Sequence, residues 1–234
     1  MQDIKKISCG DSLRPLRGVL ANWFDVLESF FKAQKDLPWW YGERSSLSLL
    51  AGAAWRTSGW VALEEFGTNK RTISTDPETG IAGKRHGRCD LYLGKGEVDY
   101  AMEAKQAGQP FGMRQSGNPY GQLSKACKKS WGAAAELLAN EASVRLAVTF
   151  IVPSMSLAGL SKNSGVMEDV ATEKIEEWLA ELPVPLAKQG IDAFAYYFPA
   201  FARTFTDEDK KRVFPGVLTT FRVRYRGANG ETEN

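Results

Sequence analysis

Four places in the chain have an acidic residue two positions before a lysine, a spacing that puts both side chains on one face of a β-strand. The four triplets are Asp3-x-Lys5, Glu103-x-Lys105, Glu208-x-Lys210 and Asp209-x-Lys211. Such triplets are frequent in charged chains, so the spacing alone predicts little. Only Glu103-Ala104-Lys105 ends an apolar segment, residues 98–105, that is typical of a strand.

A further carboxylate, that of Asp90, lies in the segment just before this strand. Segments 88–93 and 98–105 are rich in β-forming residues, and the Gly-containing segment 94–97 between them is typical of a hairpin turn. We therefore expect two neighbouring strands, with Asp90 converging on Glu103. Two carboxylates and the intervening backbone carbonyl offer the oxygen ligands that Mg²⁺ prefers.

Hydrolysis of a phosphodiester is the chemistry that these groups would support. A metal ion would polarise the phosphate and hold an attacking water. Lys105 beside it could orient that water and stabilise developing negative charge. We predict Mg²⁺ as the cofactor, with Mn²⁺ able to replace it. The structural alternative is a surface ion-pair cluster at the end of a hairpin.

With Glu43 included, the order of these groups resembles that of PD-(D/E)XK nucleases, the restriction-endonuclease-like superfamily. The resemblance implies that Asp90 and Glu103 are metal ligands and that Lys105 is catalytic. It also implies that Glu43 supports the metal, directly or through water. Cys89, and not proline, precedes the aspartate, at a position that varies widely in the superfamily.

The resemblance covers about residues 42–152. Within it, Gly42-Glu43-Arg44, an amphipathic helix, Gly59-Trp60 and a strand are similar to the opening of archaeal Holliday-junction resolvases. Acidic residues are also favoured in a first helical turn by the helix dipole. The alternative for Glu43 is therefore a purely structural role at the start of its helix. Glu64 and Glu65, at the end of the next strand, are rivals for the same supporting role.

Nucleic-acid contacts are predicted at two places. Lys84, Arg85 and Arg88 lie just ahead of Asp90 in a long polar segment, where contacts to phosphates would be useful. Gln122 and Lys125 share a stripe of the helix that follows, and Gln122 also resembles a glutamine found in some branches of the superfamily. Ordinary solvated charges are the alternative for both groups.

The pattern of apolar residues predicts the elements that position these groups. Helices are expected from Leu16 to Lys35, from Gly42-Glu43 to Gly59, over Leu123 to Leu138 and over 167–182; strands are expected over 60–66, 88–93, 98–105, 144–152, 193–198 and 217–225; loops are expected over 68–87 and 106–120. The order predicts an α/β fold with a mixed central sheet flanked by helices. The resemblance makes its centre a restriction-endonuclease-like α-β-β-β-α-β core.

At 234 residues the chain is predicted to be one domain. It would consist of an accessory N-terminal helix (12–36), the nuclease core (42–152), a C-terminal extension of helix and strands (153–226) and a disordered tail (227–234). The apolar stripe of the first helix is either core or the surface of a homodimer.

Composition excludes several function classes. The net charge is +2, so any nucleic-acid surface must be local. Three separated cysteines favour neither a zinc knuckle nor disulfides, and no segment has the length of a signal peptide or membrane span, which predicts a soluble, cytoplasmic protein without membrane contact. A single histidine and the absence of Gly-x-Ser-x-Gly and P-loop motifs argue against triad hydrolysis and ATP hydrolysis.

The sequence therefore predicts a metal-dependent nuclease acting on DNA, in restriction or phage defence, with RNA left open as a substrate. If ATP-driven movement is needed, a separate motor or activator protein would supply it. The alternative is a catalytically inactive member of the same fold that binds nucleic acid or protein.

Overall fold

The computed structural model describes residues 2–75, 82–112, 118, 120–138, 140–160, 167–207, 209 and 211–224. The strands are β1 (Ile4–Cys9), β2 (Val61–Thr75), β3 (Ala82–Lys95), β4 (Val98–Pro110), β5 (Val144–Ser156), β6 (Ala193–Phe198), β7 (Thr206–Asp207), β8 (Arg212–Val213) and β9 (Val217–Arg224). The helices are α1 (Arg17–Gln34), α2 (Glu43–Arg56), α3 (Gly121–Glu136), α4 (Leu157–Leu160), α5 (Met167–Glu181) and α6 (Pro183–Lys188), with 3-10 turns at Asp11–Leu16, Pro38–Trp40 and Ala200–Ala202.

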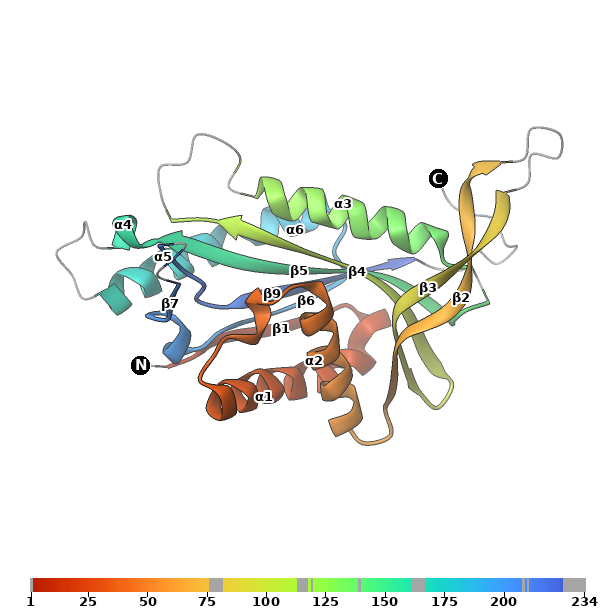
Figure 1. The fold of residues 1–234 in the computed structure, drawn as a ribbon, viewed down its shortest axis with the longest axis horizontal. Coiled ribbons are helices and arrows are strands. Elements are labelled where there is room, and N and C mark those ends of the chain that lie inside the picture. Colours follow the sequence, from red (N-terminus) through yellow and green to blue (C-terminus); the bar gives the residue numbers. More distant parts are fainter. Residues whose placement is uncertain are drawn as a thin grey trace.

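The protein is an α/β structure built on one mixed sheet (Figure 1). Its strands follow the order β1-β6-β9-β5-β4-β3-β2. The pairs β2–β3 and β3–β4 are antiparallel, while β4 and β5 run parallel and are connected through α3, as a parallel crossover requires. The mixed sheet flanked by helices confirms the predicted fold class. In chain order, α2, β2, β3, β4, α3 and β5 follow the predicted α-β-β-β-α-β succession.

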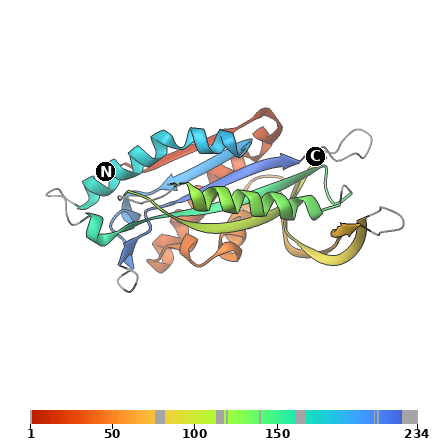
Figure 2. The ribbon, with the colours of Figure 1, turned by 90° about the horizontal axis from the view of Figure 1, so that it is seen from above.

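Helices cover both faces of the sheet, as the view from above in Figure 2 also shows. Side chains of α1 and α2 pack with residues of β3, β4 and β5 in one buried cluster. Side chains of α3, α5 and α6 form a second cluster on the opposite face. Because β5 lies between the two clusters, its residues from 145 to 155 are all buried. This agrees with the prediction of a central strand covered on both faces.

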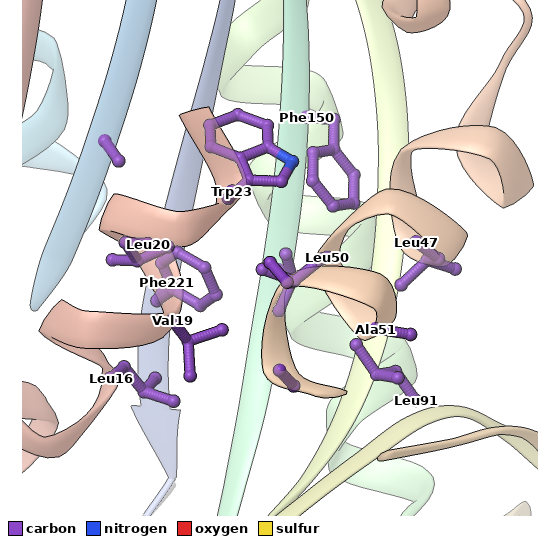
Figure 3. Packing of buried hydrophobic residues seen from close by; sticks show 14 of the residues in the cluster. Leu16, Val19, Leu20, Trp23, Leu47, Leu50, Ala51, Leu91, Phe150 and Phe221 are labelled. Carbon is purple, nitrogen blue, oxygen red and sulfur yellow. The ribbon is translucent and has the colours of Figure 1, made fainter. Parts of the chain in front are cut away.

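The apolar stripe of α1 packs inside this chain. Figure 3 shows Trp23 on α1 and Leu50 on α2 lying over Phe150 of β5 and Phe221 of β9. The rings of Trp23 and Phe150 are 6.4 Å apart. Burial of each such side chain contributes about 1.5 to 3 kcal/mol, so the stripe holds α1 and α2 against the sheet. Trp23 and Leu27, both 1 % exposed, are therefore core residues.

Strand β1 is an element that the sequence did not predict. It pairs antiparallel with β6, from Ile4 opposite Phe198 to Cys9 opposite Ala193. Its two lysines are exposed and its other residues are half-buried, so it lacks the strict alternation of a strand with one buried face. Pairing with β6, almost 190 residues later in the chain, is what makes this segment a strand.

The prediction of a loop over residues 68–87 is wrong for most of this segment. Strands β2 and β3 continue as a two-stranded ribbon, residues 67–75 and 82–88, which we call the β2–β3 arm. It projects from the sheet beside the end of α3 (Figure 1). Polar residues such as Thr68 and Asn69 hide the strand signal in the sequence, because cross-strand backbone hydrogen bonds hold the arm together.

The predicted loop over 106–120 also begins too early, because β4 remains paired with β5 as far as Pro110 opposite Ser154. Within the described ranges, no helix is long and apolar enough to cross a membrane. The tail predicted at 227–234 lies outside the described residues.

Candidate active site at the fork between β3 and β4

The central sheet splits where the candidate catalytic residues lie. The ladder between β3 and β4 runs from Lys95 opposite Val98 to Leu91 opposite Met102 and ends there. Beyond this point β3 stays with β2 in the arm, while β4 stays with β5. The next residue on each strand is Asp90 on β3 and Glu103 on β4. We call this place the fork.

Asp90 replaces a missing backbone partner at the fork. The amide N–H of Ala104 points to the side of β4 that β3 has left, and it donates to Asp90 Oδ2 at 2.8 Å. Without this carboxylate the amide would lose a hydrogen bond in a half-buried place, which is costly. Within the described structure, Asp90 Oδ1 has no such bond, so this oxygen is open to another ligand.

Glu43 reaches the same open edge from α2. Its Oε2 accepts a hydrogen bond from the amide of Gln106 at 3.1 Å, and its Oε1 lies 3.1 Å from Lys105 Nζ. Lys105 also donates to the carbonyl of Ala104. The Glu43 and Lys105 side chains are about one-third exposed, so this ion pair adds little stability, about 0 to 1 kcal/mol. Its main effect is to fix the position of the ammonium.

Gln106 is a positioning residue that sequence reasoning missed. Its side chain donates to the carbonyl of Trp39 at 2.9 Å and accepts from Ser46 Oγ at 2.7 Å. These bonds tie β4 to α2 and to the turn before it, and so they hold Glu43 at the edge of β4. The one available signal was its place directly after Lys105, on the opposite face of the strand.

Glu103 is the most buried acid of the fork, at 3 % exposure. Burial, together with the smaller effect of the Asp90 charge, raises the pKa of its carboxyl to about 7, while Lys70 and Lys105 act in the opposite direction. Asp90 is thus close enough to Glu103 for their charges to interact. At neutral pH Glu103 is close to half protonated in the structure as it stands.

Lys70, on the arm, is the partner of Glu103. Its ammonium lies 2.6 Å from Glu103 Oε1, and the residue is only 8 % exposed. Charge attraction holds the pair. Lys70 also forms a backbone bridge with Leu137 just after α3. The sequence did not reveal this contact, since it depends on the long arm folding back over the end of α3.

Three acids of the fork, Asp90, Glu103 and Glu43, were predicted to bind a metal ion. In the part of the chain that the structure describes, no group of three or more His, Cys, Asp or Glu side chains is arranged to hold a metal ion. Of these acids, Glu43 forms an ion pair with Lys105. Asp90, Glu103 and the Ala104 carbonyl are still hard oxygen donors of the kind that suits Mg²⁺, and Oδ1 of Asp90 is open.

The basic residues predicted ahead of Asp90 lie on the arm, in strand β3 and not in a loop. Lys84, Arg85 and Arg88 are exposed. Arg85 pairs with Glu136 at the end of α3, and Arg88 lies 3.6 Å from Glu65. Their strand positions give the arm a positively charged surface next to the fork.

Gln122 and Lys125 are not brought together with the fork or the arm. Both are exposed on the first turns of α3, whereas the arm meets the other end of this helix (Figure 1). At 1.5 Å of rise per residue, about 20 Å of helix separate Gln122 from Glu136. A nucleic-acid role for these two residues would therefore need a ligand that extends along α3.

The rival acids Glu64 and Glu65 lie on β2, across β3 from the fork. Glu64 accepts a hydrogen bond from Ser48 Oγ at 2.7 Å and is exposed. Glu65 has a positive φ of 50°, uncommon for a residue other than glycine, and the pairing between β2 and β3 skips this position. Glu65 lies opposite Asp90, and the register between β2 and β3 is the same on both sides of this position.

Protein-family models, curated proteins and solved structures give no match to this chain. The interpretation of the fork therefore depends on its own geometry. That geometry brings together Asp90 from β3, Glu103 and Lys105 from β4, and Glu43 from α2.

Proposed function

We propose that the chain is a divalent-metal-dependent nuclease of the PD-(D/E)XK type that hydrolyses phosphodiester bonds in DNA. The observation that supports this most is the convergence at the fork of Asp90, Glu103 and the Lys105–Glu43 pair. These groups come from three elements, and only folding brings Glu43 within 3.1 Å of a residue 62 positions later.

Each group has a role that its surroundings favour. Asp90, Glu103 and the Ala104 carbonyl would hold Mg²⁺, which when bound would polarise the phosphate and activate water. Lys105 keeps its ammonium at the partly exposed edge of β4, where it can orient the water and stabilise negative charge on the phosphate. Glu43 acts as a positioning residue, because it fixes that ammonium through Oε1 and the strand edge through Oε2.

A specific observation favours a second candidate, a nucleic-acid-binding protein without cleavage. Lys70 already neutralises Glu103, and the carboxylates of Asp90 and Glu43 already accept backbone hydrogen bonds. In that case the fork is a structural joint that closes the open edge of β4, and the basic arm binds the nucleic acid. The two candidates differ in whether the fork takes up a metal ion.

Cleavage assays separate the two candidates. The chain would be incubated with supercoiled DNA, linear DNA and RNA in Mg²⁺, Mn²⁺ or EDTA, together with Glu103→Gln and Lys105→Ala. Lys5→Ala is the matched control, because it removes the lysine of another acidic-x-Lys triplet from the exposed strand β1.

The proposal predicts metal-dependent cleavage by the unchanged chain and by Lys5→Ala, with a loss of at least about 100-fold in the two fork variants. Full cleavage by folded Glu103→Gln and Lys105→Ala would overturn it. Tight binding of DNA with no cleavage in any metal would favour the second candidate.

A further inference from the structure

Two arginines of β9, two strands away from Glu103 in the sheet, stack on one tryptophan of α3. The guanidinium carbons of Arg222 and Arg224 lie 3.6 Å and 4.2 Å from the centre of the Trp131 ring. Tryptophan is the best aromatic partner for a cation, and stacking fixes the planes of both guanidinium groups. Since the two arginines are two positions apart on β9, they lie on the same face of the sheet.

More positive charge surrounds this pair. Arg145 on β5 is the ladder partner of Arg224 and so shares its face. Burial lowers the pKa of Arg224, and the neighbouring charges of Arg222 and of Arg71 on the arm lower it further. Arg145 donates to the carbonyl of Leu137, just after α3. The guanidinium groups thus gather around the C-terminal end of α3.

Among the described residues, no ion pair is seen for three of these arginines. Within the described ranges, no Asp or Glu oxygen lies within 4.0 Å of the nitrogens of Arg71, Arg222 or Arg224. The Nε of Arg224 is buried and has no hydrogen-bond partner. Gathered cations repel one another, and a buried donor without a partner is costly, so the arrangement is incomplete without an anion.

The fork provides a contrast within the same molecule, because each of its lysines lies within 3.1 Å of a carboxylate oxygen. A guanidinium group presents parallel N–H donors that match the oxygens of a phosphate. Two guanidinium groups held against one indole ring are therefore suited to a phosphate group.

The position of the cluster favours a phosphate that belongs to a long polyanion. The described end of β9 lies beside the end of α3 and the base of the arm in both overall views (Figures 1 and 2). Lys84 is exposed on that arm, and Arg85 is paired there with Glu136. Positive charge thus continues from the stacked arginines to Lys84 on the arm, as a polyanion would require.

We propose that Arg222, Arg224 and Trp131 form a binding site for a backbone phosphate of a polynucleotide. The identity of the ligand as a polynucleotide rests on the proposed function, whereas the anion site itself does not require cleavage. The site is an anchor for nucleic acid on β9 and α3, two strands from Glu103, and it shares no residue with the fork.

Binding in EDTA tests this inference without any contribution from cleavage. The affinity of the full chain for a labelled DNA duplex would be measured by fluorescence anisotropy at several salt concentrations. The variants are Arg222→Ala, Arg224→Ala and Arg222→Lys. Arg14→Ala is the control, because Arg14 is an exposed arginine of the N-terminal 3-10 turn that pairs with Asp11.

We expect each arginine-to-alanine change to weaken DNA binding about tenfold and to reduce the salt dependence by about one phosphate contact. Arg222→Lys should recover part of the affinity, because it keeps the charge but loses the paired donors. Arg14→Ala should bind as the unchanged chain does. Thermal unfolding of each variant checks that the fold is intact.

Unchanged affinity and salt dependence in folded Arg222→Ala and Arg224→Ala would overturn the inference. A second measurement uses inorganic phosphate alone and follows tryptophan fluorescence. If inorganic phosphate binds as tightly as DNA does, the polynucleotide assignment is overturned and a small-anion site replaces it. Failure of the nuclease proposal would look different, because DNA binding would depend on the arginines while no cleavage occurred in any metal.

Discussion

The fork and the arginine cluster treat charge in opposite ways. At the fork, each lysine has a carboxylate partner and two carboxylates close the open edge of β4. Beside α3, Arg222 and Arg224 lie on the ring of Trp131, and neither forms an ion pair with an acid of the described structure. We therefore expect the fork to be complete in the free protein and the arginine cluster to bind an outside anion. Accordingly, we expect the fork to contribute mainly to the stability of the fold and the arginine cluster mainly to anion binding.

The largest effect is expected from breaking the buried pair of the fork. Lys70→Met leaves the Glu103 carboxylate buried without its cation, which should lower the free energy of unfolding by about 3 to 5 kcal/mol at pH 8. The double variant Lys70→Met/Glu103→Gln removes both charges and should recover most of this loss. Urea denaturation without metal measures both values.

The control for that experiment is Lys84→Met, an exposed lysine on the same arm, which should change the free energy of unfolding by less than about 0.5 kcal/mol. Equal effects of Lys70→Met and Lys84→Met would show that the ion pair does not hold the arm to the fork.

The pH dependence of stability sharpens the comparison. The pKa of Glu103 is about 7 in the folded chain against 4.5 as its ordinary value, so the folded state binds the proton more tightly. This stabilising contribution is complete below pH 4.5 and is lost as the pH rises through 7, by roughly 3 kcal/mol in total. Denaturation curves of the metal-free chain should show this loss in the free energy of unfolding between about pH 5 and pH 8, the range in which Glu103 titrates.

The glutamine of Glu103→Gln cannot titrate. In this variant the free energy of unfolding should therefore change less with pH than in the unchanged chain. An unchanged slope in Glu103→Gln would mean that other groups cause the pH dependence. The site would then hold an ordinary ionised carboxylate.

A smaller effect is expected at the partly exposed pair. Glu43→Gln should cost at most about 1 kcal/mol of stability, because the ion pair is one-third exposed. Cleavage should still fall about tenfold or more, since Lys105 loses the group that positions it. Single-turnover rates beside unfolding curves separate the two effects. A loss of stability with no loss of cleavage would make Glu43 a structural residue only.

The smallest stability effect is expected at the arginine cluster. Arg222→Ala removes one of several like charges, so the free energy of unfolding should change by less than about 0.5 kcal/mol even though DNA binding weakens. Unfolding curves at low salt measure it. A large loss of stability would mean that the stacked arginines serve the fold, which would remove the contrast with the fork.

Local patterns predicted much of the fold. The spacing of Leu20, Trp23 and Leu27 predicted α1, and the apolar run from Val144 to Val152 predicted the central strand β5. In both cases the pattern reflects burial against the core, which leaves a periodic trace in the sequence. The hairpin signal around residues 94–97 likewise predicted that β3 and β4 are neighbours.

What the sequence did not predict depends on contacts between distant segments. Strand β1 exists because β6 pairs with it, and the arm exists because two polar strands pair with each other. The contact of Lys70 with Glu103 needs the arm to fold over the end of α3, so no local pattern could reveal it. The sequence linked Glu43 to Lys105 only through a family resemblance, and the ion pair between them became visible only in the folded structure.

The most direct test of the central claim is whether the fork binds a divalent ion. Mn²⁺ would be titrated into the full chain at pH 8, where Glu103 is mostly ionised, and followed by electron paramagnetic resonance. The account predicts a bound ion that is lost in Asp90→Asn and in Glu103→Gln but kept in Glu64→Gln, a change to an exposed acid on β2. Binding that persists unchanged in folded Asp90→Asn and Glu103→Gln would contradict it.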